Sequence, residues 1–411
     1  MMDSLLCGFV FWLVGYTLAF GDGNSFLGIH YYQGGKDMFS KKQYAHFFFQ
    51  LSYASTPSTI VSGAVVDRIS FIAYVTYSAF ISGVLYPIVC HWVWHPEGWL
   101  VHLGFKDFCG SSALHLVGGS CAIAAAVILG PRINRFPKPG YQRTPEEELR
   151  FSHHNAVVSY LFSFVTHQIV DIFSLLDRMI LYTGFFAFNG GSVLHITKLG
   201  DGEMLGKIMI ITWLASSGGA FGTLLWFRLG LVDGNPRWSL LNALNAGLSG
   251  MVLTEKLKID DPIDVIAVHF GGGLWGTVGN SMLRHDSFVG GYGYQGGWYL
   301  AYQIAGALTI MLWSAGLSAV LFGSLRYLGL LRVSPEDELR VKHKEQSYQG
   351  IMCICDYMQK KHDISATELR GTHHGLSNPP SYNTSTLSLS PDIGEQLQHG
   401  LSHRHVSDVR L

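Results

Sequence analysis

The stretch DFCGSSALHLVGGSCAIAAAVILGPR, from Asp107 to Arg132, decides the fold class of this protein. After its opening aspartate it is apolar or small for about 22 residues, the length that a helix needs to cross a bilayer core of roughly 30 Å. A proline and an arginine close the stretch, and one histidine, His115, lies in its first third. The sequence therefore predicts a membrane-spanning helix that carries an imidazole into hydrocarbon.

The whole chain has the composition of a membrane protein. Of its 411 residues, 48% are hydrophobic and only 14% are charged, whereas soluble proteins carry about 25% charged residues. We predict an all-α polytopic protein in the lipid bilayer, with spans near residues 4–21, 45–66, 69–95, 108–130, 155–190, 204–229, 238–254, 262–284 and 297–330. The net charge of −1 gives no indication of nucleic-acid binding. The six scattered cysteines form neither a disulfide framework nor a zinc spacing, so no metal and no cofactor is expected.

Charge predicts the orientation and the domain boundary. Four loops belong in the cytoplasm by the positive-inside rule: residues 65–70, which contain Asp67 and Arg68, and the basic loops 130–143, 227–237 and 255–262. We expect a transmembrane domain over residues 1–333 and a cytoplasmic tail over residues 334–411. Because much of this tail is rich in Ser, Pro and His without periodicity, most of it should be disordered.

Two regions do not fit this scheme of simple crossings. The segment SLLNALNAGLSGMVL (239–253) lies between two loops that both belong in the cytoplasm, and a single crossing cannot begin and end on one side. The span near 155–190 is too long for one ordinary helix and contains Asp171, Asp177 and Arg178. Charges at mid-bilayer cost at least about 2.5–3.5 kcal/mol each. We therefore expect irregular structure at both places.

His115 and His269 are the ionisable residues that stand out inside the predicted spans. Such residues are rare in membranes and usually functional, although either one alone could equally make a structural hydrogen bond. The two lie on spans of opposite direction, each beside glycines, so we expect them to meet and to line a narrow pore for a small polar solute. Ligation of a haem by the pair is a further interpretation.

Three aspartates precede predicted spans and are expected to cap them. Asp107 precedes the span of the opening stretch, and its carboxylate should accept amide hydrogens of the first turn. A secondary effect on cations in the outer mouth is also expected of Asp107. Asp260 and Asp261 should cap the span near 262–284 in the same way.

Aromatic side chains cluster near the predicted outer ends of the spans. Trp94 ends the third span, where it fits an interfacial belt residue or a cation–π site. Ser192 offers a hydroxyl near the outer end of its span, and Phe188 lies one helical turn deeper.

Five ordered motifs of the chain resemble signatures of the ammonium transporter family (Amt/Mep/Rh), and more closely its Amt branch than the Rh glycoproteins. They are FFQLSYASTPSTIVSGAVVDR (48–68), HWVW (91–94), DFCGSSALHLVGGSCAIAAAVILGPR (107–132), GFFAFNGGS (184–192) and LKIDDPIDVIAVHFGGGLWG (257–276). The resemblance covers residues 1–345. It implies the helix bundle of that family and a homotrimer in which each subunit has its own pore.

The resemblance also implies a role for particular residues. His115 and His269 match the twin histidines of the pore, and Phe188 and Tyr53 match two stacked rings that gate it. Trp94 and Ser192 match the outer ammonium site, with Phe49 as a further aromatic and Asp107 as the essential aspartate. The ring at position 53 is usually phenylalanine in the family, and the tyrosine hydroxyl either wets the gate or points aside.

The implied function is ammonium transport across the cell membrane. Ammonium would be recruited outside and deprotonated, and neutral ammonia would pass the histidines, because a bare ion in hydrocarbon is prohibitively costly. Methylammonium is a further candidate substrate. The alternative is a non-conducting ammonium receptor or a regulatory subunit of a transporter trimer. The sequence contains no nucleophile triad and no nucleotide-binding loop that would suggest an enzyme.

The chain also departs from the family in three places. The family has eleven spans, and this chain begins at what resembles the second. After HNAVVSYL it has about 18 additional residues, FSFVTHQIVDIFSLLDRM (162–179), and between RLG and KIDDP one of two spans is missing. We expect an incomplete gene model or a splice variant as the cause.

Overall fold

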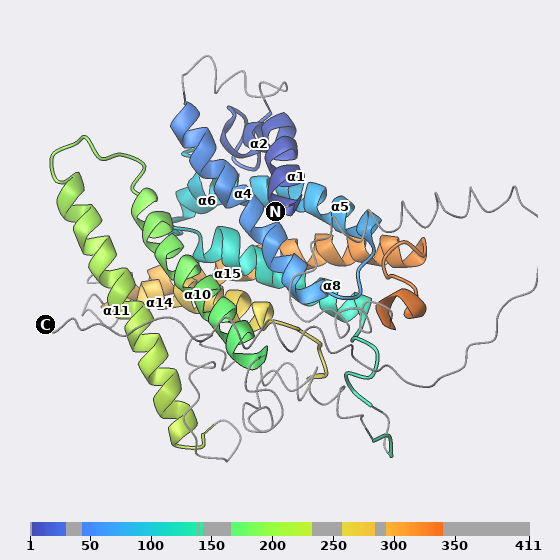
Figure 1. Ribbon diagram of the computed structural model, residues 1–411. Helices are drawn as coiled ribbons and strands as arrows, with labels where there is room; N and C mark the ends of the chain where they lie inside the picture. The colour runs from blue at the N-terminus through green and yellow to red at the C-terminus, as the bar shows by residue number, and fades with distance from the viewer. Residues whose placement is uncertain are drawn as a thin grey trace, which may run out of the picture. The chain divides into compact units, whose positions relative to one another are not determined.

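The computed structural model describes residues 2–29, 43–137, 140–142, 166–231, 257–283 and 293–339 (Figure 1). The chain divides into two units, Met1–Gly350 and Ile351–Leu411, and all described residues lie in the first. These residues are mostly helical, and they form no β-strand beyond two isolated bridges. The predicted all-α class is therefore confirmed. The boundary near residue 333 stays a prediction, because most of the tail lies outside the described residues.

The first half of the unit contains three long helical rods. The first consists of α1 (Met2–Val10), the π-helical turn η1 (Phe11–Gly15) and α2 (Tyr16–Phe20), and the second is α4 (Tyr44–Val65). The third consists of α5 (Phe71–Phe80), the π-helical turn η2 (Ile81–Leu85) and α6 (Tyr86–Trp94), and the short helix α7 (Trp99–Leu103) follows it. The first and third rods approach closely at their π turns, where a Cβ added to Gly15 would lie 2.8 Å from the carbonyl oxygen of Ser82.

The second half begins with η3 (Ser111–Leu116) and α8 (Val117–Leu129), which together form the predicted span of the opening stretch. Then follow α10 (Thr166–Gly191), α11 (Asp201–Arg228), the π turn η6 (Ile266–Gly271) with α14 (Gly272–Leu283), and α15 (Gly293–Tyr327). Five of the described helices are long and apolar enough to cross a membrane: Met2–Phe20, Phe71–Leu103, Ser111–Leu129, Asp201–Arg228 and Gly296–Tyr327.

Helix α8 lies at the centre of the packing, between α4 and α15 (Figure 1). Its side chains are small, so neighbouring backbones approach it closely. A Cβ added to Gly118 would lie 3.1 Å from the Cα atom of Pro57 in α4, and the Cys121 thiol contacts the carbonyl of Ser314 in α15 at 3.7 Å. The most buried part of the described chain therefore surrounds the span that carries His115.

The irregular regions predicted from the sequence are only partly described. The segment 239–253 lies outside the described residues, and so does the beginning of the span near 155–190. The described part of that span, α10, is one continuous helix of 26 residues.

Candidate functional site

The two histidines predicted to meet are in contact. The Nδ1 atoms of His115 and His269 are 2.9 Å apart, and the rings are nearly parallel, with an interplanar angle of 3° and centroids 5.1 Å apart. A neutral imidazole has one donor and one acceptor nitrogen, so this contact requires a donor on one ring and an acceptor on the other. The pair therefore holds one proton between its Nδ1 atoms.

Each histidine lies on a π-helical turn at the beginning of its span. His115 belongs to η3 and His269 to η6. The two spans run in opposite directions, since the end of α8 meets the segment before η6 where the Arg132 amide donates to Asp260. Single π turns inside helices are frequent at functional sites because they turn a side chain out of the regular register. No pattern in the sequence indicated these turns.

Glycines bring the two turns together. A Cβ added to Gly119 would lie 2.5 Å from the backbone nitrogen of Phe270, and one added to Gly273 would lie 2.6 Å from the carbonyl oxygen of Ser111. Real Cβ atoms essentially never approach backbone so closely. The absence of side chains at both glycines therefore lets the helices approach until the imidazoles touch.

A row of aromatic rings leads away from the histidine pair. The ring of Phe188 in α10 lies 6.1 Å from that of His115, and the Tyr53 ring of α4 stacks on Phe188 at 4.4 Å. The rings of Trp94 and Phe49 then lie 5.6 and 4.5 Å from the Tyr53 ring. The structure thus brings together the predicted pore, gate and outer aromatic residues, which come from five different elements.

Ser192 contacts Tyr53 and Phe188, the two predicted gate residues, and is nearly buried. Its hydroxyl donates to the carbonyl of Phe188 at 2.9 Å and also contacts the Tyr53 hydroxyl. The Tyr53 hydroxyl therefore points toward the predicted outer site. The sequence had left the direction of this group open.

Asp107 caps the span of His115, as the sequence suggested. Its carboxylate accepts the backbone amides of Gly110, Ser111, Ser112 and Ala113 at 2.7–3.1 Å, and the Ser112 hydroxyl at 2.5 Å. Its backbone carbonyl accepts the indole N–H of Trp94 at 2.8 Å. With both carboxylate oxygens occupied, Asp107 supports the site by fixing the helix start and the neighbouring indole.

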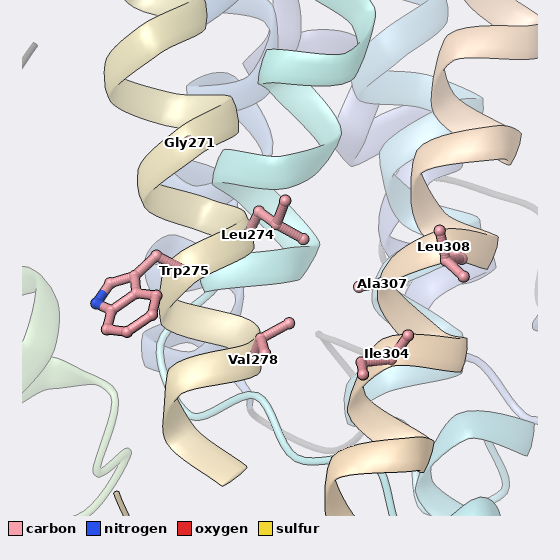
Figure 2. A pocket seen from close by; sticks show the side chains of 7 residues that line it. All are labelled: Gly271, Leu274, Trp275, Val278, Ile304, Ala307 and Leu308. Carbon is pink, nitrogen blue, oxygen red and sulfur yellow. The ribbon is translucent and has the colours of Figure 1, made fainter. Parts of the chain in front are cut away.

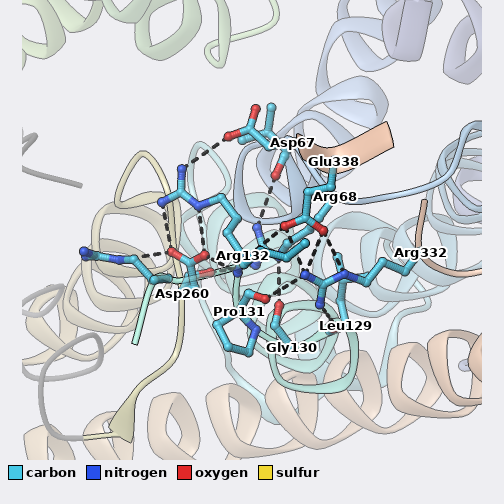
Figure 3. A network of polar contacts seen from close by, with 12 residues as sticks. Asp67, Arg68, Leu129, Gly130, Pro131, Arg132, Asp260, Arg332 and Glu338 are labelled. Atoms are coloured by element: carbon cyan, nitrogen blue, oxygen red, sulfur yellow. Dashed lines mark hydrogen bonds and ion pairs between the residues drawn. The ribbon is translucent and has the colours of Figure 1, made fainter. Parts of the chain in front are cut away.

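The other predicted pair of caps has two different roles. The Asp261 carboxylate accepts the amides of Val265 and Ile266 and caps its span as expected. The expectation for Asp260 was wrong, because its carboxylate binds the Arg132 guanidinium at 2.9 and 3.0 Å instead (Figure 3). The buried guanidinium of Arg132, just after α8, offers Asp260 charge-assisted hydrogen bonds to both carboxylate oxygens, which are stronger than bonds from neutral amides.

Asp260 belongs to a buried polar network that joins four helix ends (Figure 3). Arg68, after α4, donates to the carbonyls of Gly130 and Asp260, both at 2.8 Å. Arg332, after α15, pairs with Glu338 at 2.9 Å. This network lies at the opposite end of α8 from Asp107, and it holds the ends of α4, α8 and α15 beside the beginning of the His269 span.

An apolar groove of about 520 Å³ lies between α14 and α15 (Figure 2). Its lining consists of Gly271, Leu274, Trp275, Val278, Ile304, Ala307 and Leu308. Because these side chains offer almost no polar surface, the groove is not suited to an ammonium ion. Within the described part of the chain, His, Cys, Asp and Glu residues form no group of three that could hold a metal.

These features define the class of protein. It is a polytopic helical membrane protein in which a contacting pair of histidines lies next to stacked aromatic rings. A model of the ammonium transporter family matches residues 1–253 and 247–348. A Caenorhabditis elegans protein named as a candidate ammonium transporter 1 is 32% identical over 97% of this chain and 80% of its own length. Ammonium transporter 1 member 1 of Arabidopsis thaliana is 30% identical over 82% of this chain and 75% of its own.

Solved structures agree with the sequence relatives. A protein described as a sensor Amt protein is 28% identical, has a TM-score of 0.68, and matches over 82% of this chain and 86% of its own. Candida albicans Mep2, at 22% identity and a TM-score of 0.62, shares the fold over 81% of this chain and 77% of its own. The chain belongs to the ammonium transporter family, and it is of the Amt type.

Proposed function

We propose that this chain carries ammonium across the cell membrane through a pore lined by His115 and His269. The contact between their Nδ1 atoms is the observation that carries the proposal. When two neutral imidazoles share one proton between their Nδ1 atoms, the Nε2 of one ring carries a proton and can donate, and the Nε2 of the other ring can accept. Such a pair can both accept a hydrogen bond from ammonia and donate one to it.

The outer site is assigned to Trp94, Ser192 and Phe49. An indole face attracts a cation by about 0.5–2 kcal/mol, depending on how far it is desolvated, and the serine oxygen can accept one N–H. Together these groups replace part of the hydration shell of ammonium before it reaches the gate. Asp107 acts on this site through the helix start and the Trp94 indole that it fixes, rather than as a direct ligand.

The gate of Tyr53 and Phe188 separates this outer site from the histidines. Their stacked rings form an apolar barrier that disfavours an ion more than a neutral species, because moving a bare ion into a medium of low dielectric costs on the order of tens of kcal/mol. Ammonium can give a proton to water at the outer mouth and enter as ammonia. Potassium has no proton to lose, and it is excluded on that ground.

The remaining expectations concern assembly and placement. We propose a homotrimer in the cell membrane, with the C-terminal tail in the cytoplasm and methylammonium as a second substrate. The exposed apolar side chains of α11, such as Trp213, Phe221 and Trp226, suit contact with lipid or with a neighbouring subunit. Nothing in the proposed mechanism makes or breaks a covalent bond other than N–H, so the chain acts as a transporter rather than an enzyme.

The proposal is tested by uptake of ammonium in a yeast strain that lacks its own ammonium transporters. We expect His115→Ala and His269→Ala each to lower uptake by about 5- to 150-fold, because the remaining buried imidazole loses its hydrogen-bond partner, and an unsatisfied buried polar group costs about 1–3 kcal/mol. Surface expression of each variant, measured with an epitope tag, separates loss of transport from loss of folding. Full uptake by both well-expressed alanine variants would contradict the proposal.

A non-conducting ammonium sensor is the second candidate, and two observations favour it. The gate rings are stacked face to face at 4.4 Å, and one matched structure is described as a sensor. Such a protein binds ammonium but moves none. Calorimetric titration of the purified chain with ammonium chloride, beside the uptake assay, distinguishes the two functions.

A further inference from the structure

The hydroxyl of Tyr53 makes contacts that a phenylalanine could not make. It contacts the Ser192 hydroxyl, and the carbonyl of Phe188 lies 3.4 Å away. Its ring is 2% exposed and stacks on Phe188. One side chain thus contacts both halves of the proposed machinery, the gate through its ring and the outer site through its hydroxyl.

The distances favour one direction for these hydrogen bonds. The Phe188 carbonyl lies 2.9 Å from the Ser192 hydroxyl and 3.4 Å from the Tyr53 hydroxyl, so Ser192 is the better donor to it. Ser192 then accepts from the Tyr53 hydroxyl, since the contact between the two oxygens needs one proton. The result is a chain of donors that runs from Tyr53 through Ser192 to the backbone of α10.

In this arrangement ammonium and the Tyr53 hydroxyl need the same hydrogen-bond acceptor, the Ser192 oxygen. Ammonium has only donors, so it can bind the Ser192 oxygen only through a lone pair, and the Tyr53 hydroxyl already occupies one of these. A nearly buried serine has little room for a second donor at its remaining lone pair. Binding of ammonium and the closed position of Tyr53 therefore compete for one acceptor.

We propose that the Tyr53 hydroxyl is a latch that holds the gate closed until ammonium displaces it from Ser192. The inference rests on the proposed function, because it assigns ammonium to Ser192. Once the hydroxyl is displaced from Ser192, only its longer contact of 3.4 Å with the Phe188 carbonyl holds it, and the ring can turn away from Phe188. Ammonium binding and gate opening are then one event, and the latch lowers the apparent affinity of the outer site.

The test compares Tyr53→Phe with the wild-type chain by two measurements. Removal of one hydrogen bond of ordinary strength should lower the apparent Kd for ammonium chloride about 2- to 10-fold in calorimetry. The maximal uptake rate in yeast should rise by a similar factor. Tyr77→Phe serves as the control, because Tyr77 is a buried tyrosine whose ring packs against Phe322 instead of the gate.

A second background isolates the hydrogen bond itself. In Ser192→Ala the acceptor of the latch is absent, so adding Tyr53→Phe should change neither the Kd nor the rate. An unchanged or weaker affinity of Tyr53→Phe in the wild-type background would overturn the latch, and so would a full effect in Ser192→Ala. Failure of all variants to bind ammonium would overturn it as well. If Tyr53→Phe binds more tightly while no variant transports, the latch stands and the transport proposal fails.

Discussion

At the scale of single residues, the site depends on hydrogen-bond capacity. His115 and His269 occupy apolar spans, where their main polar partners are each other, and Asp107 uses both carboxylate oxygens on one helix start. The sequence predicted the capping by Asp107 because its partners follow within six residues. It predicted the meeting of the histidines, 154 residues apart, because each is an ionisable residue beside glycines in an apolar span. It could not predict the partner of the Tyr53 hydroxyl, since no comparable pattern pairs Tyr53 with Ser192.

The contact between the histidines predicts that their substitutions do not add. Once His115→Ala has removed the shared proton, His269 has lost its partner, so the further change His269→Ala should lower uptake by much less than it does alone. Residues that share one hydrogen bond are coupled in this way. Initial uptake rates of the two single variants and the double variant, corrected for surface expression, give the coupling. Independent roles would instead give a double variant whose loss is the product of the two single losses.

At the scale of the elements, the sequence predicted where the helices lie but not how they are wound. Hydrophobic length placed α4 at residues 45–66 and the His269 span at 262–284, within a few residues of the observed Tyr44–Val65 and Ile266–Leu283. The π turns among the described residues could not be predicted, because no sequence pattern marks them and they lie where helices distant in sequence approach closely. At η3 and η6 these approaches are those of the backbone at Gly119 and Gly273.

We expect Gly119→Ala to separate the histidines without touching either of them. The added Cβ would lie 2.5 Å from the Phe270 backbone, so α8 and η6 must move apart. Overpacking of this kind costs about 1–3 kcal/mol, and uptake should fall toward that of His115→Ala. Gly316→Ala on α15 is the matched control, because a Cβ added there meets nothing within 4 Å. Wild-type uptake by Gly119→Ala would show that the contact between the rings is not needed.

At the scale of the whole described unit, the two ends of α8 are held by different means. The Asp107 end depends on a cap within one element, and the Arg132 end depends on a buried network from four helix ends (Figure 3). The sequence placed Asp67 and Arg68 in one loop, Arg132 at the end of the opening stretch and Asp260 before a later span, without pairing them. In the structure Arg132 pairs with Asp260 and also with Asp67, at 3.2 Å. Their convergence depends on tertiary packing, which charge patterns along one sequence do not contain. The network thus fixes where the His269 span begins relative to α8.

The ion pair of Asp260 with Arg132 predicts how stability depends on pH. Burial raises the pKa of Asp260, but hydrogen bonds from Arg132 and the positive charge of this side chain outweigh that effect and hold it below the usual 3.8. A carboxylate whose folded pKa is depressed contributes stability above its unfolded pKa and loses it as the pH falls through the folded pKa. Thermal unfolding of the purified protein should therefore show this contribution intact at pH 5 and above, and fading below about pH 4. Asp260→Asn removes the more buried of two carboxylates that pair with Arg132, the other being Asp67 at 3.2 Å, so it should cost about 3–5 kcal/mol at neutral pH and flatten the loss in acid. Asp22→Asn, at an exposed aspartate, should change neither quantity. An Asp260→Asn variant with wild-type stability and the wild-type acid slope would show that the network does not hold the helix ends together.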